Sequence, residues 1–127
     1  MSEAACPCGS GRSTAACCGV FHAGEPAPDA ERLMRSRYSA FVLGLENYLL
    51  STWHPETRPE AVELDAEPRP HWIGLAVRSF SVLDETHATV EFVARYKLNG
   101  RAFKLHETSR FERIAGRWLY VDGDMHA

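Results

Sequence analysis

Two runs of alternating apolar and polar residues meet at Asn99-Gly100, and they constrain the fold of this 127-residue chain more than any other feature. A period of two is typical of a β-strand with one buried face. Asparagine and glycine both tolerate positive φ, so the pair predicts a tight turn between two antiparallel strands. In the first run, HATVEFVARYKL, the residues expected on the buried face are Ala88, Val90, Phe92, Ala94, Tyr96 and Leu98.

Further alternating segments extend this hairpin into a larger sheet. The stretch WIGLAVRSFSVLD predicts a preceding strand whose phase slips at Arg78-Ser79, as a β-bulge would cause. The stretch RWLYVDG predicts a last strand with Trp118 and Tyr120 on one face. On the strand that starts at Arg101, the residues expected to face inward are Phe103, Leu105, Glu107, Ser109 and Phe111. Together these segments predict a four-stranded antiparallel sheet.

Two helices are expected before the sheet. Apolar residues recur at the intervals of an amphipathic helix at Ala30, Leu33, Met34, Tyr38, Phe41, Val42 and Leu45. Asp29 is the expected N-cap of this helix, and Gly44 is its expected end. A second helix should stop before Pro55, and segment 55–70 predicts a surface loop with one helical turn near residues 59–64. Helices followed by an antiparallel sheet give an α+β fold.

All four cysteines lie close together near the start of the chain, in CPCGSGRSTAACCG. The first residues form neither a basic nor an apolar signal segment, so we expect a cytoplasmic protein, in which thiols stay reduced. A close cluster of reduced thiols indicates a metal or redox site rather than a disulfide framework. Gly9 and Gly11 let the chain turn back between the two cysteine pairs. Four thiolates would form a closed, structural zinc site with the ligands Cys6, Cys8, Cys17 and Cys18.

Other roles for the cysteines stay open from the sequence. The thiols could be uncoordinated in a floppy tail, or they could serve in redox chemistry, although a disulfide between adjacent Cys17 and Cys18 would be strained. His22 could act as a ligand, but beside the linker GEPAPD at residues 24–29 it is expected to be solvated. The prediction is one zinc ion per chain.

Composition narrows the partners that the chain can have. The net charge is -3, so the chain as a whole does not attract nucleic acid or an anionic membrane. No run of about 18 apolar residues occurs, so no transmembrane helix is predicted. The sequence also lacks a phosphate-binding glycine loop, a serine-triad motif and a dinucleotide fingerprint.

The cysteine spacing resembles that of the SEC-C motif, a zinc-binding module first described at the C-terminus of the SecA translocation motor. With CCGVFHAG and APDAERLMRSRYSAFVLG, the chain resembles the YchJ-like family of uncharacterised bacterial proteins, and YLLSTWHPETR, WIGL, HETSRF and GRWLYVDG continue the likeness. The resemblance implies a SEC-C motif at residues 1–24 and a domain of the nuclear transport factor 2-like, or cystatin-like, type at residues 28–127. In such a domain a curved sheet wraps over the helices as a cone.

The segment between the cysteine pairs departs from the usual SEC-C pattern. SEC-C modules usually carry lysines and an aromatic residue there, which are thought to help contact a chaperone or the ribosome. In this chain the segment is RSTAA, and Arg12 is its only basic residue. Zinc binding should survive this change, whereas docking to an acidic or RNA partner is placed in doubt.

The resemblance also implies a pocket between the sheet and the helices. A buried carboxylate needs a partner, so we expect Arg37 or Arg35 on the first helix to reach Glu107. This pair could simply orient the helix on the sheet, or it could act on a ligand together with Ser109. The other residues expected around the pocket are Tyr38, Trp53, His54, Trp72, Trp118 and Tyr120.

A shift of the third strand by one residue would change the chemistry of this pocket. His106, Thr108 and Arg110 would then face inward, and His106 would become the candidate acid or base. Asp122 and Asp124, after the last strand, are expected to be turn and terminus residues rather than a second metal site.

Three functions are compatible with these features. The main prediction is an adaptor, in which the zinc module docks on a protein partner while the cone forms a homodimer or holds a small ligand. The alternative is a small-molecule enzyme of the hydrolase, isomerase or dehydratase type, with Glu107, His106 or Ser109 as the acid–base group. Direct nucleic-acid binding is the weakest of the three, because the net charge and the missing lysines oppose it.

Overall fold

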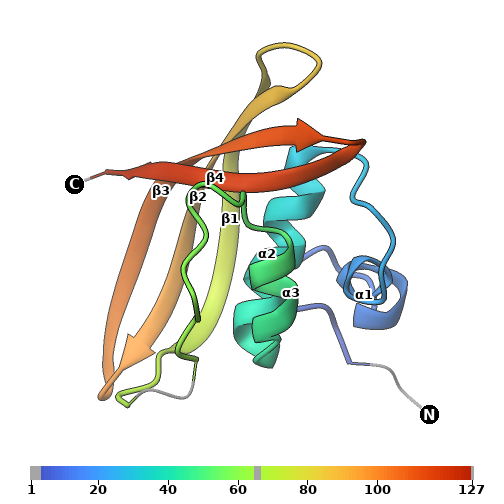
Figure 1. The fold of residues 1–127 in the computed structure, drawn as a ribbon. Coiled ribbons are helices and arrows are strands. Elements are labelled where there is room, and N and C mark those ends of the chain that lie inside the picture. The colour runs from blue at the N-terminus through green and yellow to red at the C-terminus, as the bar shows by residue number, and fades with distance from the viewer. Residues whose placement is uncertain (1–3, 65–66, 127) are drawn as a thin grey trace.

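The computed structural model describes residues 4–64 and 67–126 and packs helices against one face of a four-stranded antiparallel sheet (Figure 1). The strands are β1 (His71–Val82), β2 (His87–Leu98), β3 (Arg101–Ile114) and β4 (Arg117–Met125), and they lie side by side in chain order. The helical elements are η1 (Thr14–Ala16), α1 (Cys18–His22), α2 (Ala30–Leu43) and α3 (Glu46–Ser51). The predicted α+β fold with a four-stranded meander is confirmed.

Helix α2 begins and ends where the sequence predicts. The side chain of Asp29 accepts a hydrogen bond from the backbone N–H of Arg32 at 2.7 Å, and Gly44 closes the helix with φ of 75°. The prediction of a single buried face was incomplete, because Ser36 and Ser39 are fully buried as well. Val42, expected on the apolar face, is 37% exposed. The helix is thus covered on more than one side near its middle and projects into solvent near its C-terminal end.

The loop after α3 contains no helical turn at residues 59–64, so that prediction was wrong. The backbone N–H of Val62, which a helical turn would use internally, donates instead to the carboxylate of Glu46 on α3, at 2.9 Å. The loop passes along the edge of β4, where the backbone N–H of His54 donates to the carbonyl of Tyr120 at 2.7 Å.

The sheet register follows the alternation of the sequence. Asn99 and Gly100 form the tight turn with φ of 51° and 79°. The predicted slip in β1 is present between Val77 and Ser79, and a second shift lies between Trp72 and Gly74. The sheet is strongly curved, so that β4 crosses over one end of α2 (Figure 1). This curvature creates the cone that the family resemblance implied.

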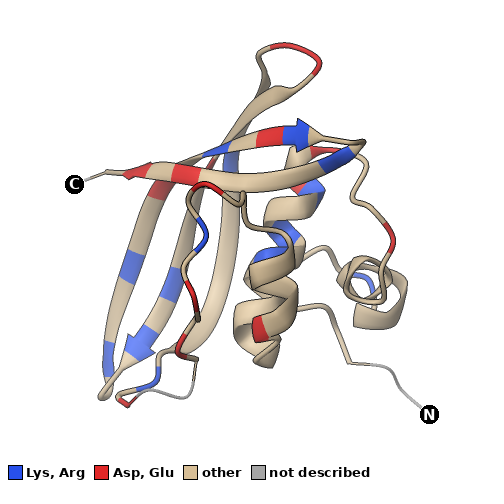
Figure 2. Cartoon of the chain, in the orientation of Figure 1, with Lys and Arg blue, Asp and Glu red and all other residues tan. Residues whose placement is uncertain are grey.

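The main core lies between α2 and the sheet, and its buried residues are Ala27, Ala30, Leu33, Met34, Ala88, Val90, Phe111 and Trp118. A second, smaller cluster contains three cysteines of the N-terminal segment. We call residues 4–24 the cysteine module; in Figure 1 its helix α1 lies on the other side of α2 from the sheet. Lys and Arg residues gather near the β2–β3 turn, away from this module (Figure 2). In the described part of the chain, no helix is long and apolar enough to span a membrane.

Candidate functional site

The cysteine module brings its two cysteine pairs together through tight turns. Gly9 and Gly11 have φ of 81° and 85°, a conformation that glycine adopts without strain, and they reverse the chain after Cys8. The backbone N–H of Cys6 donates to the carbonyl of Arg12 at 2.9 Å, which closes this loop. Helix α1 then begins at Cys18 and carries the second pair to the first.

The four thiols lie close enough together to share one ion. Each offers an Sγ atom, all within 4.8 Å of one another, and the Sγ atoms of Cys8 and Cys17 are 3.7 Å apart. Zinc–sulfur bonds of about 2.3 Å place tetrahedral ligands about 3.8 Å from each other. All four cysteines are free, and Cys6, Cys8 and Cys18 are buried. The donor set therefore fits a zinc ion held entirely by thiolates.

The electrostatics of the cluster favour a cation. Burial raises the pKa of Cys8 and of Cys18. Burial also acts to raise the pKa of Cys6, but hydrogen bonds with Ser39 and with the backbone of Cys8 and Cys18 outweigh it and lower that pKa to about 6. One thiol thus ionises readily while its neighbours resist ionisation. Because thiolate is the form that binds metal, a divalent cation bound here would hold the thiols in their ionised form.

The cysteine module is attached to α2 by polar contacts at its base. The Sγ atom of Cys6 lies 3.5 Å from the hydroxyl of Ser39, and Arg35 donates to the carbonyl of Cys8 at 2.9 Å. Arg35 also pairs with Glu31 at 3.1 Å. The prediction that Arg35 reaches the cone pocket was therefore wrong. Positions 35 and 37 point in different directions because two residues turn a helix by about 200°.

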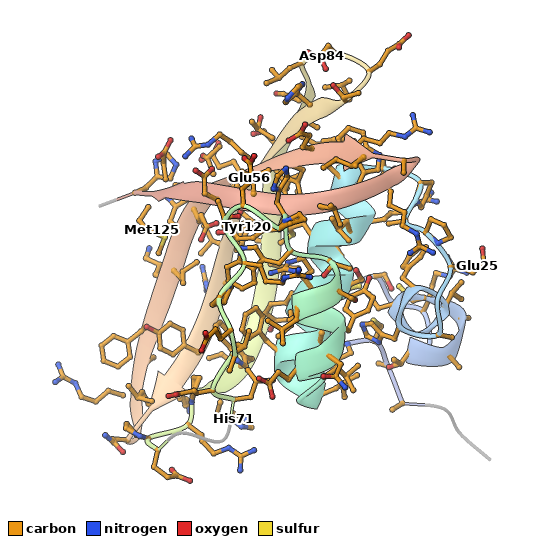
Figure 3. The ribbon with its side chains drawn as sticks, viewed as in Figure 1. Glu25, Glu56, His71, Asp84, Tyr120 and Met125 are labelled. Carbon is orange, nitrogen blue, oxygen red and sulfur yellow. The ribbon has the colours of Figure 1, made fainter. Side chains whose placement is uncertain are left out.

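A cavity of about 260 Å³ lies between α2 and the concave face of the sheet, and we call it the cone cavity. Its lining is mainly aromatic and aliphatic and consists of Met34, Arg37, Tyr38, Phe41, Trp53, Trp72, Phe92, Ala94, Leu105, Glu107, Ser109, Phe111 and Tyr120. Figure 3 shows Tyr120 reaching from β4 into the layer of side chains between the sheet and α2. Most of the predicted pocket residues thus share one cavity.

Glu107 lies on the cavity wall with two hydrogen-bond donors. Its Oε2 accepts from the hydroxyl of Ser109 at 2.5 Å and from that of Tyr120 at 3.1 Å. It also lies against Gly123 of β4, where a Cβ atom would collide with the carboxylate. Because Phe92 pairs with Glu107 in the register, both face the cavity. Sequence reasoning missed Gly123, which gave no signal beyond being a glycine in a strand.

The alternative register, with His106 facing inward, is excluded. His106 pairs with Val93 and hydrogen-bonds Glu91 at 2.7 Å on the other face of the sheet. Neighbouring strand residues point to opposite faces, so His106 cannot line the cavity when Glu107 does.

Arg37 is the buried cation of the cone cavity, with only 6% of its surface exposed. It donates to the carbonyl of Leu49 at 2.8 Å and to the hydroxyl of Thr52 at 2.7 Å. Its guanidinium lies over the rings of Trp53 and Tyr120, 5.0 and 4.8 Å from their centroids. Burial lowers the pKa of Arg37 to about 10, so the side chain is still charged at neutral pH.

The expected ion pair between Arg37 and Glu107 is not among the salt bridges of the described residues. Tyr120 connects the two groups instead, since its ring lies under the guanidinium and its hydroxyl donates to the carboxylate. Burial and the negative charge of Glu107 both raise the pKa of Tyr120, which keeps this hydroxyl protonated as a donor.

Trp53 contributes an unsatisfied donor to the cavity lining. Its indole Nε1 is buried and has no hydrogen-bond partner among the described residues. The residue is held firmly, because the backbone around it pairs with Tyr120 of β4. A buried donor without a partner costs about 1–3 kcal/mol, and native proteins keep few of them. Trp53 is therefore a lining residue whose polar atom the described residues leave unsatisfied.

Besides Arg35, two predicted pocket residues lie outside the cone cavity. His54 is buried, but its Nε2 pairs with Glu112 at 3.0 Å. Trp118 belongs to the main core and faces Phe21 of the cysteine module across a separate cavity. Its strand has an irregular register next to Phe111, which the simple alternation did not predict. His22, expected to be solvated, is half-buried and hydrogen-bonded to the carbonyl of Ser36 at 2.9 Å.

Comparisons with known proteins define the family. A family model described as YchJ, middle NTF2-like domain, matches residues 29–123. The chain belongs to the YchJ family. A UPF0225 protein of Bordetella parapertussis is 57% identical over 127 residues, which cover 98% of this chain and 95% of that protein. A UPF0225 protein of Ralstonia nicotianae is 58% identical over 134 residues, which cover 96% and 92%.

Two solved structures show the same architecture as this YchJ-family chain. A SEC-C motif containing protein from Rhodopseudomonas palustris has a TM-score of 0.84 and 32% identity, covering 96% of this chain and 98% of that one. A SEC-C motif containing protein from Psychrobacter arcticus has a TM-score of 0.73 and 27% identity, covering 96% and 82%. The resemblance to SEC-C and YchJ-like proteins is thus confirmed, and a cysteine cluster that could hold a metal accompanies it.

Proposed function

We propose that the chain is a zinc-containing protein whose cone cavity binds a small molecule. Four thiolates leave a zinc ion no open position, so the metal would fix the cysteine module on α2 rather than take part in chemistry. Cys6, Cys8, Cys17 and Cys18 would hold it. The cavity on the opposite side of α2 would then be the functional site.

The observation that carries this proposal is an apolar cavity lined by Trp53, whose buried Nε1 has no partner among the described residues, and by the polar groups of Arg37 and Glu107. Ligand sites combine an apolar lining with a few polar groups that fix orientation. Here the polar groups would be Trp53, the Arg37 guanidinium and the Glu107 carboxylate. The cavity lies below the usual range of about 300–1,000 Å³, which favours a compact ligand with an apolar ring and one hydrogen-bond acceptor.

The test is a screen of small aromatic fragments that carry a carbonyl or carboxylate group, followed by ¹⁵N NMR of the zinc-loaded protein. We expect bound fragments to shift the indole signal of Trp53, while the signal of Trp118, outside the cavity, stays in place. Trp53→Phe keeps a ring but removes the donor, so it should weaken binding about tenfold. Fragments that bind without moving the Trp53 signal, or equally well to Trp53→Phe, would refute this site.

Catalysis in the cavity would depend on Glu107. Its carboxylate is held by Tyr120 and Ser109, as a general base could be held beside a bound substrate. Glu107→Gln keeps the size of the side chain and removes the negative charge. An enzyme would lose turnover of its substrate in this variant, whereas a binding protein would change only its affinity.

The second candidate function is docking of a protein partner by the cysteine module. A groove of about 570 Å³ runs between the module and α2, and its lining includes Arg12, Arg32 and the exposed Val20. Arg32 is 62% exposed in its side chain and lies 3.9 Å from Asp29. Helix α2 thus adds Arg32 and the pair of Arg35 with Glu31 to the groove, so that its lining carries more basic than acidic groups, which favours an acidic peptide.

The docking test uses fluorescent acidic peptides and the zinc-loaded chain. We expect Arg12→Glu combined with Arg32→Glu to abolish binding while zinc content and the melting temperature stay the same. Lys97→Glu with Lys104→Glu, at the far end of the sheet, is the matched charge control. Equal binding by all three proteins, or no binding by the wild type, would exclude the groove as an acidic-peptide site.

A further inference from the structure

Three residues of the metal-ligating type meet on the outer face of the sheet, away from both sites described above. They are Glu91 from β2, His106 from β3 and His126, which follows β4, and their ligand atoms lie within 4.8 Å of one another. The register explains this meeting. Glu91 pairs with Thr108, and the backbone N–H of His126 donates to the carbonyl of His106 at 2.8 Å. The backbone of the sheet therefore holds all three.

The side chains are already ordered by mutual contacts. The Nε2 of His106 lies 2.7 Å from Oε2 of Glu91. The rings of His106 and His126 stack with centroids 4.1 Å apart and an angle of 22° between planes. Hydroxyl groups support two of the three ligands: Ser79 donates to Glu91 at 3.3 Å, and Thr108 lies 2.7 Å from Nε2 of His126. Outer hydrogen bonds of this kind orient the ligands of metal sites.

We propose that Glu91, His106 and His126 form a second metal site, which takes a divalent transition ion of the nickel, copper or zinc group. Imidazole nitrogen and carboxylate oxygen suit these ions. The hydrogen bond between Glu91 and His106 accounts for two of the three groups. His126 adds a third donor atom within 4.8 Å of the other two, which a metal ion would use.

This site would differ in kind from the cysteine cluster. It is partly exposed and offers three protein ligands, so one position would be open to water or to an external ligand. The four thiolates of the cysteine cluster are softer and more numerous, so zinc would fill them first. The ion would tie the C-terminal segment to β2 and β3, because its ligands come from all three.

The experiment titrates Ni²⁺ into the zinc-loaded protein and follows it by calorimetry and NMR. We expect one Ni²⁺ ion to bind per chain with retention of zinc, and to broaden the amide signals of residues 91, 106 and 126 first. His126→Ala and Glu91→Gln should each weaken binding at least about tenfold. His87→Ala is the matched control, since His87 is also exposed on this sheet but pairs with Asp84 at 3.0 Å.

Several outcomes would overturn the proposal. One is wild-type protein that binds no Ni²⁺ beyond its zinc. Another is an affinity that His126→Ala and Glu91→Gln leave unchanged, or that His87→Ala lowers equally. Loss of zinc in step with Ni²⁺ uptake would show exchange at the cysteines instead.

Discussion

At the scale of single residues, Gly123 is the position most tightly linked to the cone cavity. A Cβ atom there would collide with the carboxylate of Glu107. We predict that Gly123→Ala displaces this carboxylate from Ser109 and Tyr120 and lowers the free energy of unfolding by about 1–3 kcal/mol, the cost of an unsatisfied buried polar group. Urea unfolding measures the change.

Gly74→Ala is the control for this prediction, because Gly74 lies in the same sheet and a Cβ there would meet nothing within 4 Å. It should cost clearly less than Gly123→Ala. Equal losses in the two variants would show that the cost comes from the strand backbone rather than from Glu107.

Residue patterns predicted the cavity wall in part. The regular alternation of β3 was enough to turn Glu107 and Ser109 inward, since the side-chain period of a strand is fixed. The partner of Glu107 was not predictable in the same way. Helix geometry alone places Arg35 and Arg37 on different sides of α2, but which of the two sides meets the sheet and which meets the cysteine module depends on tertiary packing. The unsatisfied Nε1 of Trp53 depends on a loop conformation that no local pattern specifies.

At the scale of elements, β3 and β4 are linked by a charged network on the outer face of the sheet. Arg110 donates to the carboxylates of both Asp122 and Asp124. Both aspartates lie within β4 and pair with β3, so the expectation that they are turn and terminus residues was wrong. The hydrogen bond from Arg110 lowers the pKa of Asp124 below its ordinary value.

The pKa of Asp124 is lower in the folded chain than in the unfolded chain, where it is near 4, so ionised Asp124 stabilises the fold at higher pH. This stability is lost as the pH falls through the folded-state pKa. We predict that Asp124→Asn lowers the melting temperature slightly at pH 7 and that the difference disappears near pH 2. Because the pair is exposed, added salt should shrink the difference at pH 7 as well. A difference in melting temperature that persists at low pH would show that Asp124→Asn acts through lost packing rather than through charge. Glu85→Gln, in an exposed turn, is the control for the change in net charge.

At the scale of the whole molecule, the chain has two buried clusters with different origins, and Leu75 of β1 packs against both. One is the hydrophobic core against the sheet, and the other is the cysteine cluster with Cys6, Cys8 and Cys18 at its centre. Amphipathic periodicity predicted the first face of α2. It did not predict the second, where buried Ser36 and Ser39 lie, because small polar residues give no hydrophobic signal. The cone thus follows from sequence pattern, while the docking of the module on it follows from tertiary packing.

This division predicts how the chain responds to loss of metal. Apart from Phe21, which packs against the main core, residues 4–24 contribute only their cysteines to the buried clusters, so the order of the module should depend on the ion. Treatment with a strong chelator under reducing conditions should release about one zinc per chain and collapse the amide dispersion of the module. NMR signals of Phe111 and Leu33, in the main core, should persist, and the melting temperature of the chain should fall.

Cys8→Ser should reproduce the metal-free state. Ser10→Ala is the control and should keep its zinc, because Ser10 is not a ligand and only lies 3.1 Å from the Sγ of Cys17. Unfolding of the entire chain on chelation would show that the two clusters form one cooperative unit, and an unchanged module would show that packing on α2 suffices without metal.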